Sequence, residues 1–190
     1  MGYEPEDSEV GLAVTLNKTL LYPYYRGYVR SLGLKGDERI LDYGSGSGIA
    51  SRQIASILAG GGGALTCVDV SRRWSEIARQ TLRGYANVTY KLGPIAGLDL
   101  EDEAYDGVFV HFVLHDIPEI ERSEVVHHLA RVLRKGGTLF LREPTAESHG
   151  MAAEEIRTLM TQQGLRVVRM QEKRVLLLTH SVCDGVFQKG

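Results

Sequence analysis

The segment ILDYGSGSG, residues 40–48, is a short apolar strand that breaks into an acidic, glycine-rich turn, and helix-compatible sequence follows from Ile49 to Leu58. Glycines at alternate positions let the backbone turn tightly and lie close against a ligand, because they lack Cβ and accept positive φ. A dinucleotide fingerprint needs its third glycine three residues after the second. Counted from Gly46 that position is Ile49, and the third glycine comes one residue early at Gly48. Asp42 precedes the glycines, where it would repel a pyrophosphate, so we expect a positively charged ligand.

The same segment resembles the class I S-adenosylmethionine-dependent methyltransferases. Their hallmark is an acidic residue, one spacer and alternating glycines, and residues 42–48 match it. S-adenosylmethionine carries an ammonium group and a sulfonium but no phosphate, in agreement with the charge expected at the turn. Because glycine-rich loops are common, the turn alone is only moderately specific.

Three further blocks keep the order of that family. The β-rich run ALTCVDVS, residues 64–71, reaches Asp69 about 20 residues past the turn, where nucleoside-binding folds place a carboxylate for the ribose hydroxyls. Alternatively, Asp69 only caps the next helix, a role that suits Ser71 better. Residues 104–116 (AYDGVFVHFVLHD) resemble the fourth strand and the active-site loop, and residues 133–141 (LRKGGTLFL) resemble a helix end, a glycine turn and the fifth strand. The resemblance covers residues 35–189.

Composition is that of a soluble globular protein. The chain has 190 residues, enough for one domain with a substantial core, and its net charge of −2 gives no general attraction to nucleic acid or anionic membranes. No apolar stretch approaches the roughly 20 residues needed to span a bilayer, and residues 1–10 lack a signal-peptide pattern. Cys67 and Cys183 are too few for a disulfide framework. We expect a cytoplasmic protein, either a monomer or a homodimer.

Alternating strands and helices predict an α/β fold, a three-layer αβα sandwich with a mostly parallel sheet. The resemblance implies seven strands, of which the last is antiparallel. Strands are expected near 39–43, 65–69, 88–92, 105–112, 138–142, 166–172 and 182–188, and helices near 16–32, 49–58, 72–83, 121–133 and 152–163. Residues 1–32 are expected to form a tail and a lid helix, and residues 33–190 the S-adenosylmethionine-binding methyltransferase domain.

Ligands of open α/β sheets bind beyond the carboxyl ends of the strands, which predicts a single crevice there. The resemblance implies that the glycine turn contacts the methionine part of the cofactor and Asp69 the ribose. Trp74 or Val70 could pack on the adenine, although Trp74 is equally well explained as part of the helix core. Relatives often carry an acid after the third strand for the adenine amine, whereas this chain has Gly93-Pro94-Ile95. The expected cofactor-binding residues are Asp42, Gly44, Ser45, Gly46, Gly48, Asp69, Val70, Trp74, Gly93, Pro94, Ile95 and His111.

Catalytic candidates lie at the end of the fourth strand and in the first helix. Methyl transfer from a sulfonium is an in-line displacement that depends on positioning, and a base is needed only if the acceptor must lose a proton. His115 and His111 could serve, since histidine titrates near neutrality; alternatively His111 is a structural residue under the cofactor and His115 only lines the pocket. Tyr24 belongs to a tyrosine-rich segment that could wall the acceptor pocket or simply pack on the domain. No metal is expected, because the histidines and cysteines lack paired ligand spacing.

The loop after the fourth strand indicates the acceptor class. DNA and RNA amino-methylating relatives carry Asp or Asn, two prolines and an aromatic residue there, whereas residues 114–118 read LHDIP. The Val113 to Asp116 sequence resembles the small-molecule branch, including ubiquinone/menaquinone C-methyltransferases. We therefore expect a methyltransferase with a small-molecule acceptor and no nucleic-acid partner. The alternatives are a methyltransferase that acts on nucleic acid or protein with a partner, and a non-catalytic S-adenosylmethionine-binding protein.

Overall fold

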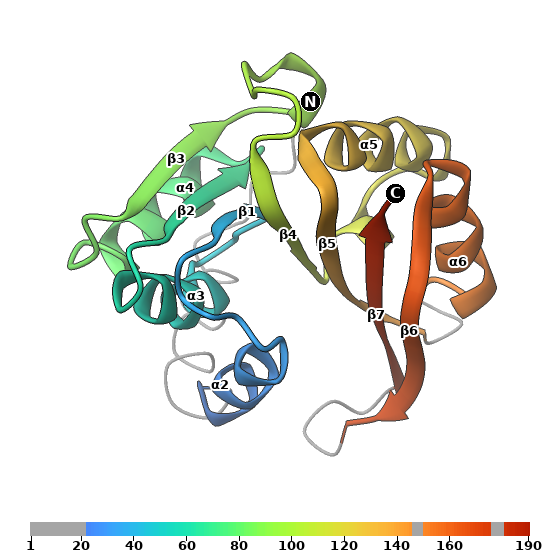
Figure 1. Cartoon of the computed structure of the whole chain (residues 1–190), viewed down its shortest axis with the longest axis horizontal. Helices are drawn as coiled ribbons and strands as arrows, with labels where there is room; N and C mark the ends of the chain where they lie inside the picture. Colours follow the sequence, from blue (N-terminus) through green and yellow to red (C-terminus); the bar gives the residue numbers. More distant parts are fainter. Residues whose placement is uncertain (1–21, 146–149, 176–180) are drawn as a thin grey trace. The chain divides into compact units, whose positions relative to one another are not determined.

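The computed structural model describes residues 22–145, 150–175 and 181–190 (Figure 1). The chain divides into two compact units, an N-terminal unit up to Leu98 and a C-terminal unit from Asp99. Their strands belong to a mostly parallel seven-stranded sheet whose last strand pairs antiparallel, so the expected fold class is confirmed. Among the described helices, none has the length and apolar character of a membrane span.

The N-terminal unit contains three parallel strands in the order β3-β2-β1. These are β1 (Arg39–Tyr43), β2 (Ala64–Asp69) and β3 (Val88–Leu92), and the helices are α2 (Tyr22–Ser31), α3 (Ile49–Ala59) and α4 (Arg72–Thr81). α3 packs against α2, β2 and α4. The strand register sets Tyr43 opposite Val68, and Asp69 opposite Leu92. The glycine turn after β1 and the acid that ends β2 therefore lie at the same edge of these strands.

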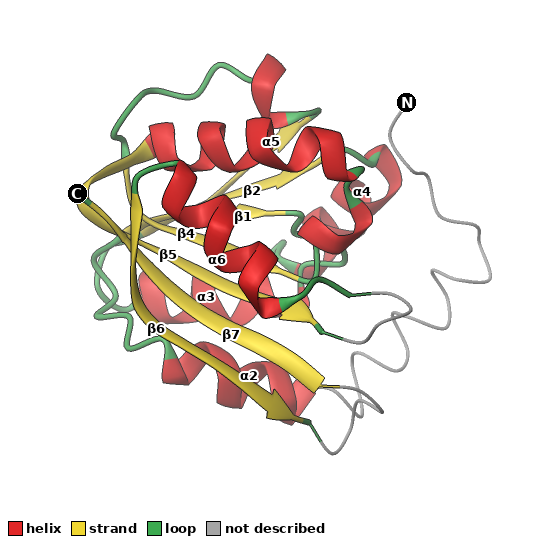
Figure 2. Cartoon of the chain, turned by 90° about the vertical axis from the view of Figure 1, so that its right-hand side faces the viewer, coloured by secondary structure: helices red, strands yellow, loops and turns green. Residues whose placement is uncertain are grey.

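The C-terminal unit contains four strands in the order β4-β5-β7-β6. They are β4 (Tyr105–His111), β5 (Leu133–Pro144), β6 (Leu165–Arg174) and β7 (Ser181–Lys189). β4 and β5 are parallel, and β7 runs antiparallel to both of its neighbours. Helices α5 (Glu119–Val132) and α6 (Ala153–Gln162) lie over one face of these strands (Figure 2). Burial of apolar side chains such as Val108, Leu139 and Phe187 contributes about 1.5–3 kcal/mol each and holds the layers together.

Several element ends differ from the sequence prediction. β5 begins at Leu133 rather than near residue 138, because Leu133 already pairs with Tyr105 ahead of an irregularity in the β4–β5 register. β4 ends at His111 because Phe112 has a φ of 58°, which breaks the extended backbone. Short 3-10 turns, η1 (Ile95–Gly97) and η2 (Leu114–Asp116), occur inside the predicted loops. For the helix expected from residue 16, only the part from Tyr22 lies within the described residues. The division of the chain into a tail with a lid helix up to residue 32 and a methyltransferase domain from residue 33 stays a prediction.

The glycine turn is required by both backbone conformation and packing. Gly44, Gly46 and Gly48 have φ values of 72°, 50° and 77°, a region that side chains with a Cβ rarely adopt. A Cβ on Gly48 would also lie 3.1 Å from the Cα of Ala78 in α4. Gly48 thus allows the start of α3 to approach α4 closely.

We predict that Gly48→Ala lowers the free energy of unfolding by about 2 kcal/mol or more. A left-handed alanine costs about 1–2 kcal/mol, and the contact with Ala78 adds an overpacking cost. The matched control is Gly62→Ala, whose φ is 85° but whose Cβ would meet nothing within 4 Å. Urea denaturation of both variants measures the difference, and equal losses of stability would show that the α3–α4 approach contributes nothing.

Candidate active site

The carboxylate of Asp69 joins the end of β2 to the glycine turn. Its Oδ2 accepts the N–H of Gly46 at 2.8 Å, and its Oδ1 accepts the N–H of Ser71 at 2.9 Å. The cap of α4 is Ser71, whose Oγ accepts the N–H of Trp74 at 3.1 Å, so Asp69 is not the helix cap. Each carboxylate oxygen can accept more than one hydrogen bond, so Asp69 can anchor the turn and still accept from a diol.

The backbone amides of the glycine turn donate hydrogen bonds to acceptors within the protein. Those of Gly44 and Ser45 donate to the carbonyl of Val68 at 2.8 and 3.1 Å, and that of Gly48 donates to the carbonyl of Ser45 at 2.9 Å. The Gly46 amide donates to Asp69, as described above. A pyrophosphate-binding turn directs such amides at its ligand. The hydrogen bonding of this turn therefore disfavours a phosphate ligand.

Asp42 lies buried beneath the turn. The residue is 2% exposed, and Ser51 Oγ in α3 donates to its Oδ2 at 2.5 Å. Burial raises the pKa of Asp42 to about 7, the Ser51 hydrogen bond opposes that rise, and the charge of Asp69 adds to it. A nearby cation favours the ionised form of such a carboxyl group. The site is therefore suited electrostatically to a positively charged ligand.

Exposed apolar side chains stand beside Asp69. Val70 is 42% exposed and Leu92, which pairs with Asp69 in the strand register, is 39% exposed. Gly93 donates its N–H to the carbonyl of Asp69 at 2.9 Å, which brings the predicted Gly93 to Ile95 loop to the end of β2, although Ile95 itself is buried. The predicted contacts thus include two carboxylates and an apolar surface, and they include no lysine or arginine. This combination fits a cationic nucleoside such as S-adenosylmethionine. The sequence analysis did not predict Leu92 as a cofactor-binding residue. Its position at the end of the third strand could have indicated it, because ligands bind beyond the carboxyl ends of the strands.

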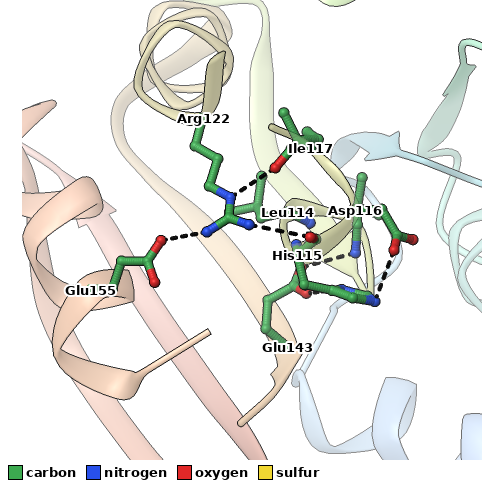
Figure 3. A network of polar contacts seen from close by, with 8 residues as sticks. Leu114, His115, Asp116, Ile117, Arg122, Glu143 and Glu155 are labelled. Carbon is green, nitrogen blue, oxygen red and sulfur yellow. Dashed lines mark hydrogen bonds and ion pairs between the residues drawn. The ribbon is translucent and has the colours of Figure 1, made fainter. Parts of the chain in front are cut away.

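In the C-terminal unit, a buried carboxylate organises the loop that follows β4. Glu143, at the end of β5, has no exposed surface. Its Oε1 accepts the N–H groups of Val113 and Leu114 at 2.9 and 2.8 Å. Its Oε2 lies 2.7 Å from His115 Nδ1 and accepts the His115 N–H at 3.4 Å (Figure 3). With Glu143 as the acceptor, Nδ1 carries a hydrogen, and Nε2 is the nitrogen that gains or loses the second proton. Nε2 itself lies 3.3 Å from Oδ1 of Asp116, whose side chain is 77% exposed (Figure 3).

The two histidines of β4 and its loop differ in electrostatics. Burial, and to a smaller extent the charge of Arg122, lower the pKa of His115. The hydrogen bond and charge of Glu143 and the charge of Asp116 act in the opposite direction and outweigh them, so the pKa is raised. Burial, and then the charge of Arg142, lower the pKa of His111 to about 3. The centroid of the His111 ring lies 5.9 Å from that of Phe109, with the two rings stacked, and 4.2 Å from that of Phe112. These surroundings favour a structural role for His111.

The third catalytic candidate, Tyr24, belongs to the N-terminal unit. Tyr24 on α2 contacts the ring of Tyr25 edge-on at 5.4 Å, and its catalytic role stays a prediction. That the residues of the N-terminal unit share one crevice with His111 and His115 also stays a prediction. In the described part of the chain, no group of three histidine, cysteine or acidic side chains could hold a metal ion.

Comparison with known proteins places these features in a family. Residues 40–137, about half of the chain, match the model of a methyltransferase domain. The demethylmenaquinone methyltransferase of Tropheryma whipplei is 31% identical over 118 residues, which are 62% of this chain and 46% of that protein. The protein-L-isoaspartate O-methyltransferase of Dictyoglomus thermophilum is 31% identical over 144 residues, 74% of this chain and 61% of that protein. The chain thus spans less than two thirds of the length of these curated relatives.

A solved structure agrees in fold. The N-methyltransferase NodS from Bradyrhizobium japonicum WM9, in complex with S-adenosyl-L-homocysteine, superposes with a TM-score of 0.77 at 18% identity, over 92% of this chain and 90% of that one. This likeness concerns the fold, whereas the match of the family model concerns the sequence from β1 to the glycine turn within β5. The chain therefore belongs to the class I S-adenosylmethionine-dependent methyltransferases.

Proposed function

We propose that this chain transfers the methyl group of S-adenosylmethionine to a small-molecule acceptor that loses a proton, with His115 as the general base. The observation that carries the proposal is the 2.7 Å contact between Glu143 Oε2 and His115 Nδ1. It orients the ring so that Nε2 is the nitrogen that would take a proton, and Asp116 Oδ1, 3.3 Å from Nε2, would stabilise the imidazolium that forms. A buried carboxylate that orients a histidine in this way is a recurrent arrangement in acid–base catalysis.

The N-terminal unit would hold the cofactor. Asp42 and the turn of residues 44–48 would receive the cationic methionine part, Asp69 the ribose, and Val70 with Leu92 the adenine. S-adenosylmethionine would supply an electrophilic methyl carbon. The acceptor's nucleophilic atom would form a bond to that carbon in line with the carbon–sulfur bond, which would break and leave its electron pair on sulfur. The acceptor's proton goes to His115 Nε2 and from there to water.

The proposed general base, His115, indicates which class of acceptor the site suits. The names of two relatives point to demethylmenaquinone and to the L-isoaspartyl group. A carboxylate is already ionised at neutral pH and needs no base, whereas a phenolic hydroxyl, with a pKa of about 10, does. Loss of that proton raises the electron density on the oxygen and on the adjacent ring carbons. The His115–Glu143 pair therefore favours a hydroxyaromatic acceptor, such as a reduced quinone, over a carboxylate.

An acceptor screen with methyl-tritiated S-adenosylmethionine tests this proposal. The pools are hydroxyaromatics that include reduced demethylmenaquinone, carboxylates that include an L-isoaspartyl peptide, amines, protein and RNA. We expect label in the hydroxyaromatic pool. Label confined to protein or RNA would show a macromolecular acceptor, and cofactor binding without transfer to any pool would support a non-catalytic binding protein.

A further inference from the structure

The loop between β4 and α5 is held from two sides. Glu143 accepts its amide hydrogens from one side. From the other side Arg122 of α5 donates to its carbonyl oxygens: Nη2 to that of His115 at 3.2 Å and Nε to that of Ile117 at 2.9 Å. The third nitrogen of Arg122, Nη1, lies 2.5 Å from Glu155 Oε1 in the first turn of α6 (Figure 3). One guanidinium thus connects the loop, α5 and α6.

This loop has little structure of its own to fix its conformation. η2 is one 3-10 turn whose backbone bonds run from Asp116 to Val113 and from Ile117 to Leu114, at 3.1 and 3.2 Å. Short 3-10 turns have poor hydrogen-bond geometry, and a single turn is not stable alone. Phe112, just before it, has the left-handed φ of 58° that a residue with a side chain seldom adopts. The direction of the His115 side chain must therefore be set by groups outside the loop.

The arginine is well suited to this task. Its side chain is only 14% exposed, and that of Glu155 is 35% exposed. The planar guanidinium presents its N–H groups in fixed directions, so two carbonyls and one carboxylate can be bound at once. The Glu155 carboxylate fixes the end of the guanidinium that does not contact the loop.

We propose that Arg122 and Glu155 are positioning residues for His115: by holding the carbonyls of His115 and Ile117, they set the direction in which Nε2 faces the acceptor. This inference rests on the proposed role of His115 as a base. The two residues act through the loop backbone and touch neither acceptor nor cofactor in the proposed reaction.

Charge gives the proposal a second observable. The charged groups that face His115 are Glu143 from β5, Asp116 from η2 and Arg122 from α5. The two carboxylates favour the imidazolium and the guanidinium opposes it. Removal of Arg122 is therefore expected to raise the pKa of His115 further.

The test compares Arg122→Ala and Arg122→Lys with wild type by NMR on the full chain labelled with ¹⁵N. Imidazole ¹⁵N shifts followed against pH report the pKa and the tautomer of His115, and amide hydrogen exchange reports the order of Val113 and Leu114. Arg122→Ala should raise the pKa, reduce the fraction with hydrogen on Nδ1 and speed both amide exchanges about tenfold or more, because two charge-assisted hydrogen bonds are lost. Arg122→Lys keeps the charge but not the planar fork, so the pKa should return toward wild type while exchange stays fast.

The matched control is Arg157→Ala. Arg157 lies on α6, the helix that carries Glu155. It pairs with Glu154 at 3.3 Å and its side chain is 46% exposed, so its removal should change none of these signals. Glu155→Gln should speed the same two amides less than Arg122→Ala does. Unchanged His115 tautomer and amide exchange in both Arg122 variants would overturn the positioning role. Full methyl transfer by His115→Ala would instead overturn the proposed function and leave the NMR result unaffected.

Discussion

Replacement of His115 by alanine is expected to lower turnover by about 10²–10⁴-fold, the usual cost of a lost general base, while S-adenosylmethionine affinity stays unchanged. The physical reason is that Nε2 accepts the proton in the proposed reaction, and that the ring belongs to the Glu143 network of the C-terminal unit. Steady-state turnover with the acceptor found by the screen, alongside cofactor titration, measures both quantities. The control is His127→Ala, an exposed histidine of α5 whose Nδ1 contacts Gln163 Oε1 at 3.1 Å and which should keep full turnover.

The pH dependence of the wild type follows from the same residue. Only neutral His115 can take a proton, and its pKa lies above the ordinary value because Glu143 and Asp116 outweigh the effect of burial. Turnover should therefore be low in acid and rise as pH increases through that raised pKa. His115→Ala should lack this rise. A His115→Ala variant with wild-type turnover and an unchanged acidic limb would reduce His115 to a residue that lines the pocket.

Replacement of Asp69 by alanine should weaken S-adenosylmethionine binding more than tenfold. Two charge-assisted hydrogen bonds to the ribose, each worth about 1.5–3 kcal/mol, would be lost. The variant also loses the acceptor for the amides of Gly46 and Ser71, which adds local disorder at the turn. Calorimetric titration gives the affinity, and denaturation confirms that the variant folds.

The matched control for Asp69 is Asp37→Ala. Asp37 is exposed and precedes β1, so it lies near the amino end of that strand and away from the edge that carries the turn. We expect wild-type cofactor affinity in this variant. Unchanged affinity in Asp69→Ala as well would mean that Asp69 only anchors the backbone of Gly46 and Ser71.

Local sequence was sufficient to predict most of the fold. The strand, turn and helix around Gly44 to Gly48 follow from an apolar run and from glycines at alternate positions, both of which can be read from the local sequence. β1 and β3 have the predicted bounds. Ser71 was predicted as the cap of α4 and is confirmed. The start of β5 was wrong by five residues, because the pairing of Leu133 with Tyr105 depends on contacts between distant segments.

The contacts within the candidate site could not be predicted in the same way. Glu143 contacts residues 28 to 30 positions away, and only the β4–β5 register, in which His111 pairs with Arg142, brings them together. The contact between Arg122 and Glu155 could not be predicted either, because the two residues are 33 positions apart and lie on different helices. The left-handed backbone of Phe112 has no sequence signal, because residues with side chains adopt it rarely. The residue types of the site were therefore predictable, but the network that orients His115 was not.

Whether the glycine turn holds S-adenosylmethionine is tested most directly by isothermal titration calorimetry on the purified chain. We predict that S-adenosylmethionine and its demethylated product, S-adenosylhomocysteine, both bind, and that NAD does not. The buried Asp42 disfavours a pyrophosphate, and the amides of Gly44, Ser45, Gly46 and Gly48 donate within the protein rather than toward a phosphate. Tight binding of NAD with no binding of S-adenosylmethionine would contradict the assignment of this site.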